Sequence, residues 1–274
     1  MAGYVGRFAP SPSGPLHLGS LVAALGSYLD ARAHQGQWLL RIEDIDPPRE
    51  VAGAADAILR TLDAYGLHWD GPVRYQHQHH QDYDQRLATL AQQQLSYRCS
   101  CTRKQLKAQG LHQRSRCHYH GGPAALRFRN DASHSHFTDR RLGLVDVDRQ
   151  LSHEDFIIHR KDGLYAYQLA VVADDIDQGV THVVRGSDLV DATVWQLALY
   201  DAFAAPHCQY LHLPLVRDEH GNKLSKQNHA TAICDDQPLP ALHQALAILG
   251  LDELQAGSVE ELLAQAVERW PWSE

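Results

Sequence analysis

The sequence lacks the features that mark membrane and secreted proteins. No apolar run reaches the ~18 consecutive residues that a membrane-spanning helix needs. The N-terminus has no basic segment followed by an apolar one, so a secretory signal peptide is not expected. Internal repeats and low-complexity tracts are also missing. We therefore expect a cytoplasmic globular protein without a membrane partner.

Cysteine is scarce, and basic charge is in the minority. The five cysteines are an odd number, which in a cytoplasmic chain argues against a disulfide framework. Lys and Arg number 25 against 33 Asp and Glu, a net charge of −8. Such a protein is no general polycation, so an RNA partner would need a locally basic surface. The hydrophobic fraction of 44% allows a buried core and excludes wholesale disorder.

The N-terminal part of the sequence predicts a parallel α/β sheet. Its successive segments are a short apolar run, a proline-rich loop, a stretch with helical apolar spacing and a second apolar run: residues 4–9, 10–15, 18–33 and 38–42. A strand–helix–strand unit of this length favours a crossover between parallel strands. Ligands of such sheets bind beyond the carboxyl ends of the strands.

The composition changes near Leu95 and becomes rich in Cys, His, Arg and Gly until about Asp148. The α/β pattern then resumes, which indicates that the middle segment is an insertion. The expected divisions are a first half, an insertion, a second half, and a lysine-containing loop with a helical C-terminal region: residues 1–94, 95–150, 151–210 and 211–274.

The segment Pro10-Ser-Pro-Ser-Gly-Pro-Leu-His-Leu-Gly-Ser20 leads onto the start of the first predicted helix. A helix N-terminus offers unpaired N–H groups and partial positive charge, which suit a triphosphate. His17 can donate to phosphate oxygens, and Gly19 leaves room for a nucleotide against the backbone. A proline- and glycine-rich loop is also ordinary helix-entry chemistry, so this segment alone does not decide the function.

A second candidate segment, Gly221-Asn-Lys-Leu-Ser-Lys-Gln227, follows an apolar strand. Its cations, Lys223 and Lys226, suit a pyrophosphate leaving group, because the charge to be stabilised develops in the transition state. Taken alone, the same segment could be a solvated basic turn.

Together, the His-Leu-Gly-Ser and Lys-Leu-Ser-Lys segments resemble the HIGH and KMSKS signatures of class I aminoacyl-tRNA synthetases, with Gln227 in place of the final serine. The resemblance implies a Rossmann-type parallel-sheet catalytic domain. Four longer segments are similar to the catalytic core of glutamyl-tRNA synthetases: residues 7–19, 40–49, 162–175 and 179–189.

The sequence continues for only 47 residues beyond Gln227, so we expect no anticodon-binding domain. It therefore resembles most a truncated branch of the glutamyl-tRNA synthetase family. The resemblance implies a ligase that activates glutamate with ATP without needing tRNA. Members of this branch transfer the glutamyl group to queuosine in the anticodon of tRNA(Asp), and no protein partner is implied.

The resemblance also assigns a glutamate site. The matching positions are Arg7, Phe8, Ala9, Pro10, Ser11, Glu43, Tyr167 and Arg185. Arginines clamp carboxylates through paired N–H donors, and Glu43 can accept from the ammonium group. Alternatively, Arg7 and Glu43 could form an ion pair at neighbouring strand ends.

The expected activation step needs no protein nucleophile. The substrate carboxylate attacks the α-phosphorus, while the enzyme supplies alignment and charge stabilisation. His17 and Lys226, assisted by Lys223, are the expected catalytic residues. Mg²⁺ would accompany ATP, with no protein ligands identified. The expected ATP contacts are His17, Gly19, Ser20 and Lys226.

Three cysteines, Cys99, Cys101 and Cys117, lie close together in the insertion. Thiolates at this density in a reducing compartment suit tetrahedral zinc, and we expect one structural Zn²⁺ per chain. The related synthetases use a tyrosine as a further ligand, but that position falls on Gln113, a poor ligand. We prefer His112 as the fourth ligand, and three free thiols remain the alternative. Other candidates are His118, Tyr119 and His120.

The insertion is locally basic, which fits either phosphate binding or a solvated face. Its basic residues are Arg98, Arg103, Lys104, Lys107, Arg114, Arg116, Arg127 and Arg129. Three other functions stay open. The protein could charge a tRNA 3′ end with the anticodon region supplied by another chain, act as a small-molecule nucleotidylyltransferase, or be an inactive RNA-binding module.

Overall fold

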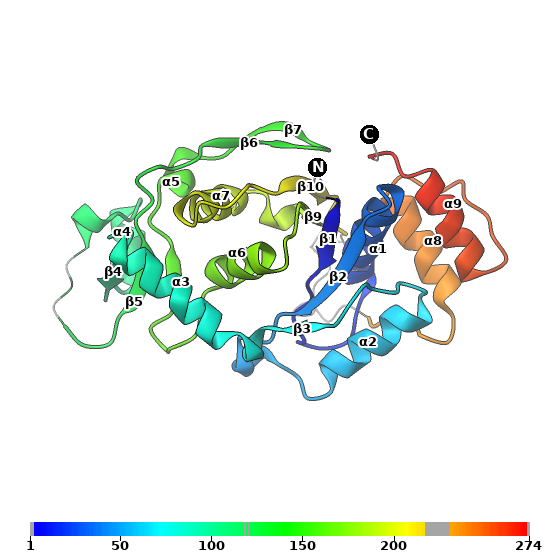
Figure 1. Cartoon of the computed structure of the whole chain (residues 1–274), viewed down its shortest axis with the longest axis horizontal. Coiled ribbons are helices and arrows are strands. Elements are labelled where there is room, and N and C mark those ends of the chain that lie inside the picture. Colours follow the sequence, from blue (N-terminus) through cyan, green and yellow to red (C-terminus); the bar gives the residue numbers. More distant parts are fainter. Residues whose placement is uncertain (1–2, 118, 120, 217–230, 273–274) are drawn as a thin grey trace. The chain divides into compact units, whose positions relative to one another are not determined.

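The structure, a computed structural model, describes residues 3–117, 119, 121–216 and 231–272 (Figure 1). The chain forms two compact units. The first comprises Met1–Gln76, Val180–Asp188 and Gln209–Glu274, and the second comprises His77–Gly179 and Leu189–Cys208. The four-part division expected from the sequence stays a prediction.

The first unit contains two groups of hydrogen-bonded parallel strands, which adjoin one another. Its strands are β1 (Val5–Phe8), β2 (Gln37–Ile42), β3 (Arg74–Tyr75), β9 (His182–Gly186) and β10 (Gln209–Leu213). β2 pairs in parallel with β1 and with β3, and β9 pairs in parallel with β10. β1 and β9 are neighbours, since the Thr181 N–H donates to the Val5 carbonyl at 2.9 Å. The predicted parallel sheet is therefore confirmed.

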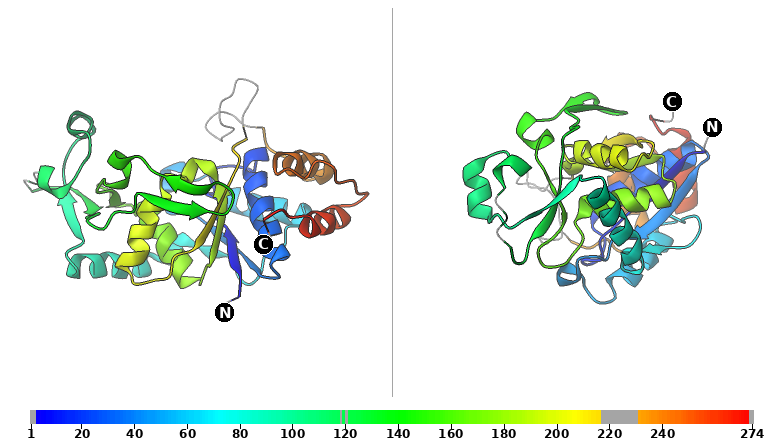
Figure 2. Two further views of the ribbon diagram at one scale, coloured as in Figure 1. Left: turned by 90° about the horizontal axis from the view of Figure 1, so that it is seen from above. Right: turned by 60° about the vertical axis from the view of Figure 1, so that its left-hand side comes forward.

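Helix α1 (Leu18–Ala33) has the bounds that the apolar spacing predicts, and it packs against β1, β2 and β9. It approaches β10 closely, because a Cβ at Gly26 would lie 2.5 Å from the Leu213 side chain. The first unit also contains α2 (Ala54–Ala64), α8 (Pro238–Ile248) and α9 (Val259–Glu268). Helices α8 and α9 lie against α1 (Figure 2).

A buried carboxylate links the two ends of this unit. Asp30 on α1 is fully buried, and it accepts hydrogen bonds from the Tyr4 hydroxyl and, at 2.8 Å, from the Trp270 indole. Tyr4 also stacks on the rings of His34 and His182. The segment before β1, helix α1 and the segment after α9 therefore meet at one polar contact inside the core.

The second unit combines helices with antiparallel strands. Its helices are α3 (His80–Gln92), α4 (Arg103–Gln109), α5 (Arg149–Ser152), α6 (Tyr167–Asp177) and α7 (Thr193–Ala202). Its strands are β4 (Ser96–Cys99), β5 (Ala125–Phe128), β6 (His136–Asp139), β7 (Gly143–Asp146) and β8 (Ile157–His159). β5 pairs antiparallel with β4 and β8, and β6 forms a hairpin with β7. Among the described residues, no helix has the length and apolarity that crossing a bilayer requires.

We expect Trp270→Phe to lower the free energy of unfolding by about 1–3 kcal/mol, because the buried Asp30 carboxylate loses a hydrogen-bond donor. Urea denaturation followed by circular dichroism measures this change. Trp69→Phe is the control, since Trp69 packs against the same core, although less buried than Trp270, and its indole has no hydrogen bond within the described part of the chain. Equal losses in the two variants would contradict the role given to the Asp30 contact.

Candidate active site and metal centre

The N-terminus of α1 is held by a reciprocal cap. The Ser20 N–H donates to His17 Nδ1 at 3.3 Å, and the His17 N–H donates to Ser20 Oγ at 2.7 Å. Because Nδ1 accepts, a neutral imidazole carries its hydrogen on Nε2. His17 therefore presents an N–H donor at the positive end of the helix, as phosphate binding requires.

A cavity of about 190 Å³ lies at this helix end. It is bounded by His17, Gly19 and Ser20 from α1, and by Gly186, Asp188 and Leu213 at the ends of β9 and β10. Helix α1 connects β1 to β2, and β9 pairs with β10, so the cavity lies between these two strand pairs. Ligands of open parallel sheets bind at such a place, beyond the carboxyl ends of the strands. A Cβ at Gly186 would lie 2.7 Å from Asp188 Oδ1, so a side chain there would force Asp188 to move.

The predicted catalytic lysines, Lys223 and Lys226, lie outside the described residues. The chain on both sides of them is described. Val216 lines the cavity, and Ala232 forms an antiparallel bridge with His17. The chain therefore leaves and returns at the N-terminus of α1.

Three arginines are buried on one face of the sheet. Arg7, Arg41 and Arg185 are 4%, 0% and 5% exposed. Their strand neighbours, including Phe8, belong to the core that contains α1. Side chains alternate along a strand, so the three guanidinium groups lie on the face opposite α1. Their positive charge makes that face suitable for an anionic ligand.

Arg185 is held by neighbouring side chains on β10. Its Nε–H donates to His212 Nε2 at 3.0 Å, and its guanidinium lies 5.2 Å from the centre of the Tyr210 ring. His212 must therefore accept through Nε2, which requires its hydrogen on Nδ1. These contacts orient the guanidinium group. His212 was not predicted as a site residue, although a polar residue inside the apolar segment 211–216 was an available signal.

Glu43 follows β2 and lies beside the proline-rich loop, since its N–H donates to the Pro10 carbonyl at 3.0 Å. Its carboxylate lies 3.9 Å from Arg41. The sequence suggests Arg7 as an ion partner of Glu43, but it does not predict the contact with Arg41, a charged residue between Leu40 and Ile42. This strand end therefore carries both charges that an amino acid needs for recognition.

The remaining predicted glutamate contacts have different environments. The Phe8 ring is buried against Trp38, with centroids 6.3 Å apart, so only its backbone could reach a ligand. Ala9 is half-buried and Ser11 is exposed. Tyr167 is the first residue of α6, in the second unit.

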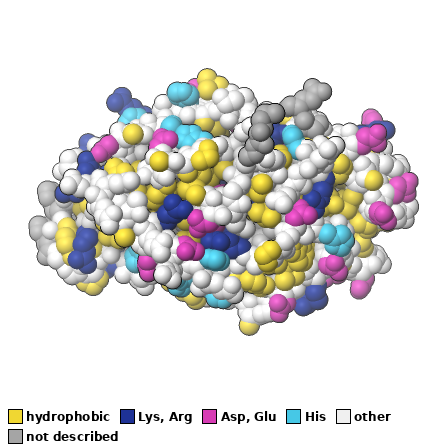
Figure 3. Space-filling view, viewed as in Figure 1, with side chains coloured by type: hydrophobic (Ala, Val, Ile, Leu, Met, Phe, Trp, Pro, Cys, Tyr) yellow, Lys and Arg dark blue, Asp and Glu magenta, His cyan; other side chains and the backbone are white. Residues whose placement is uncertain are grey.

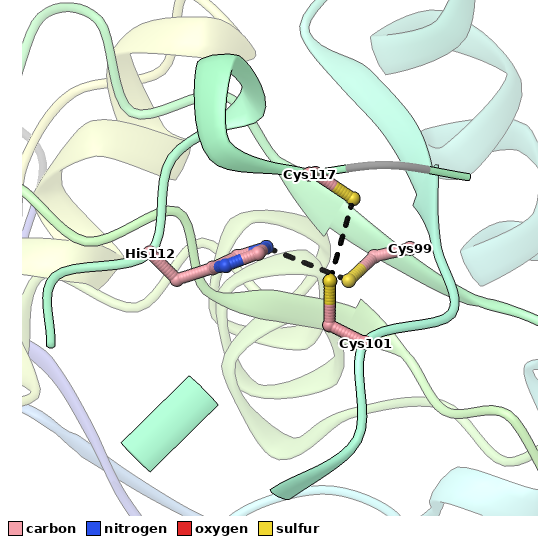
Figure 4. A group of neighbouring side chains, drawn as sticks. All are labelled: Cys99, Cys101, His112 and Cys117. Carbon is pink, nitrogen blue, oxygen red and sulfur yellow. Dashed lines mark hydrogen bonds between the residues drawn. The ribbon is translucent and has the colours of Figure 1, made fainter. Parts of the chain in front are cut away.

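In the second unit, Cys99, Cys101, His112 and Cys117 point toward one another (Figure 4). Their ligand atoms lie within 4.8 Å of one another, with 3.5 Å from Cys99 Sγ to His112 Nε2 and 3.9 Å between the sulfurs of Cys101 and Cys117. Three sulfurs and one imidazole nitrogen are a donor set that can hold a metal ion. His112 joins the cysteines as preferred from the sequence, whereas His118 and His120 lie outside the described residues.

The protonation of this cluster fits metal binding. Burial and the nearby Arg127 lower the pKa of His112, which keeps its imidazole neutral as a ligand must be. Burial opposes ionisation of Cys99, but the Cys101 N–H, the Cys117 thiol and Arg127 together lower its pKa. Burial and the two neighbouring thiols raise the pKa of Cys117 to about 12. A metal ion must therefore displace the proton of Cys117.

Two of the arginines in the insertion interact with acidic residues and carbonyl groups of the second unit. Arg127 is buried, donates to the Asp155 carbonyl and lies 3.7 Å from Glu154. Arg129 pairs with Asp131 at 2.5 Å. On the face shown in Figure 3, basic and acidic side chains are interspersed. Arg127 and Arg129 therefore neutralise acids of their own unit.

The sequence matches the family model for the catalytic domain of class I tRNA synthetases (E and Q) over residues 4–119 and 110–255. The chain belongs to this class I synthetase family. Its members are ligases, which agrees with the enzyme class expected from the signatures.

Two relatives of this class I synthetase carry the name "Glutamyl-Q tRNA(Asp) synthetase". The protein from Cronobacter sakazakii is 55% identical over 98% of this chain and 93% of its own length. The protein from Escherichia coli K12 is 54% identical over 97% of this chain and 89% of its own length.

A solved structure of a glutamate tRNA ligase from Elizabethkingia meningosepticum, in complex with its amino acid, matches the class I synthetase described here with a TM-score of 0.80 at 23% identity. The match covers 95% of this chain but only 64% of that protein. The likeness confirms the Rossmann-type parallel-sheet fold expected from the sequence.

We expect Cys117→Ser to remove about one equivalent of bound metal per chain, because a serine hydroxyl is a poor replacement for a thiolate ligand. Metal analysis of the purified protein by mass spectrometry measures this. Cys234→Ser is the control, since Cys234 is an exposed thiol away from the cluster. If both variants retain the metal content of the unchanged protein, the cluster is not a metal centre.

Proposed function

We propose that this protein activates glutamate with ATP, without tRNA, and transfers the glutamyl group to queuosine in the anticodon of tRNA(Asp). The main support is the identity of more than half of the residues, over nearly the whole chain, to relatives named for that reaction. The buried arginine face and the capped helix end supply suitable chemistry in the same unit. A tRNA substrate would place the reaction in the cytoplasm.

ATP would bind at the N-terminus of α1. His17 would donate from Nε2 to the phosphates, and Gly19 and Ser20 would contribute the first turn of the helix. Lys226, assisted by Lys223, would stabilise the pyrophosphate as it leaves. Mg²⁺ would arrive with ATP and neutralise part of the phosphate charge.

Glutamate would bind on the arginine face. Arg7 and Arg185 would hold its carboxylates, while Glu43 would accept from its ammonium group. The Ser11 and Tyr167 hydroxyls and the backbone of residues 8–10 would complete the contacts. We add Arg41, whose guanidinium lies 3.9 Å from the Glu43 carboxylate and would help to orient it.

The two chemical steps need alignment rather than a protein nucleophile. A carboxylate oxygen of glutamate attacks the α-phosphorus, the bond to the bridging oxygen breaks, and pyrophosphate leaves. A hydroxyl of the modified base then attacks the acyl carbon of the adenylate, the bond from that carbon to the phosphate oxygen breaks, and AMP leaves while the hydroxyl proton passes to the phosphate or to water. In both steps the charge grows on phosphate oxygens near His17.

We infer that the Cys99, Cys101, His112 and Cys117 cluster holds a structural Zn²⁺. Three thiolates and one imidazole favour zinc among the common divalent ions. Cys99 ends β4, Cys101 lies between β4 and α4, and His112 and Cys117 follow α4, so one ion would join four positions along the chain.

Glutamate-dependent exchange of radioactive pyrophosphate into ATP, measured without tRNA, tests the activation step. We expect exchange with glutamate, and none with aspartate or with pantothenate. No exchange would support the inactive RNA-binding module, and exchange with a small molecule other than an amino acid would support the nucleotidylyltransferase.

Transfer of labelled glutamate to purified tRNA tests the acceptor. We expect transfer to tRNA(Asp) that contains queuosine and none to tRNA(Asp) from cells that cannot make it. Charging of the 3′ end of tRNA(Glu), with tRNA(Asp) ignored, would instead identify an ordinary glutamyl-tRNA synthetase.

We expect His212→Phe to raise the KM for glutamate about tenfold or more and to leave the KM for ATP nearly unchanged, because Arg185 loses its oriented partner. A hydrogen bond to a charged group contributes about 1.5–3 kcal/mol, and tenfold corresponds to ~1.4 kcal/mol. His212→Gln is the matched variant, since it retains an acceptor and should restore part of the affinity. A KM for glutamate that is unchanged in His212→Phe would exclude this role.

A further inference from the structure

A second group of potential metal ligands lies in the second unit. Asp201, in the last turn of α7, has one imidazole at each carboxylate oxygen. His134 Nε2 lies 2.7 Å from Oδ2, and His207 Nε2 lies 2.7 Å from Oδ1. The two imidazole rings have centroids 5.5 Å apart and planes at 77°. The three side chains are thus already gathered around one point.

Solvent can reach this group. The side chains of His134, Asp201 and His207 are 28%, 48% and 38% exposed. One potential ligand atom from each residue lies within 4.8 Å of the others, as in the cysteine cluster. An ion from solution could therefore enter without opening the core.

We propose that His134, Asp201 and His207 form a second metal site, which binds a divalent transition ion such as Zn²⁺ or Ni²⁺. Imidazole nitrogen is the preferred ligand of these ions, and a carboxylate adds the negative charge that offsets the ion. Three protein ligands leave the remaining positions to water. Mg²⁺ and Ca²⁺ prefer a shell of oxygens and are not expected to bind.

The proton balance of binding follows from the distances. At 2.7 Å each Nε2 shares a hydrogen with a carboxylate oxygen, so the metal-free group holds hydrogens where the ion would sit. On binding, each Nε2 loses its hydrogen and donates its lone pair to the ion. In a neutral ring that hydrogen is replaced by one on Nδ1, with no net release; in a protonated ring the Nδ1 hydrogen stays and the Nε2 proton passes to water.

The site would join segments that are distant in the sequence. His134 lies in the link between β5 and β6, whereas Asp201 and His207 lie at the end of α7 and just after it. An ion bound only by the folded chain raises stability by mass action. Occupancy would therefore stabilise the connection between the β6–β7 hairpin and α7.

Calorimetric titration of Zn²⁺ and Ni²⁺ into the full chain tests the proposal. We expect the unchanged protein to bind one equivalent of zinc more than His207→Gln or Asp201→Asn. If the variants still bind this ion, we expect its dissociation constant to be at least ~10-fold larger in them. His136→Gln is the matched control, because His136 is an exposed histidine outside the group. Equal binding by all four proteins would overturn the proposal.

Nitrogen NMR of the histidine rings gives an independent readout. With Zn²⁺ we expect the rings of His134 and His207 to show coordination at Nε2 and a hydrogen on Nδ1. The metal proposal is wrong if zinc changes neither the ring signals nor the Tm of the unchanged protein. If Asp201→Asn also lowers the Tm without metal, the three residues only stabilise the fold through hydrogen bonds.

Discussion

A guanidinium group inside a protein requires compensating negative charge, because an uncompensated buried ion costs several kcal/mol. The first unit places Arg7, Arg41 and Arg185 inside the protein on one face of a parallel sheet. Successive side chains along a strand point to opposite faces of the sheet. Because Phe8 and its neighbours are buried against α1, the arginines point to the other face. The packing of the core and the charge of the site are therefore two consequences of one strand register.

The N-terminus of α1, beside which the cavity lies, is also close to the sheet. Gly26 allows α1 to approach Leu213, and the reciprocal cap of His17 and Ser20 fixes where the helix begins. The bridge between His17 and Ala232 returns the chain to this point after the lysine segment. The described residues on both sides of the lysine segment, Val216 and Ala232, therefore lie near the N-terminus of α1.

The second unit shows how histidine chemistry depends on burial. His112 is buried beside Arg127, and both factors favour the neutral ring that a metal needs. His134 and His207 are partly exposed and share their hydrogens with Asp201. The same residue type therefore meets two environments, one closed and rich in sulfur and the other open to water.

Local patterns in the sequence determine much of this protein. Apolar spacing predicts the bounds of α1, the order of strand and helix predicts the parallel sheet, and the dense cysteines indicate a metal centre. Arg41 and His212 were missed, because periodicity reports the faces of one element and not which side chains of separate strands meet. The group of His134, Asp201 and His207 has no characteristic spacing at all. Such contacts form only when distant segments pack against one another. The free energy that brings these segments together comes from the packing of the whole unit, so no short stretch of residues reveals it.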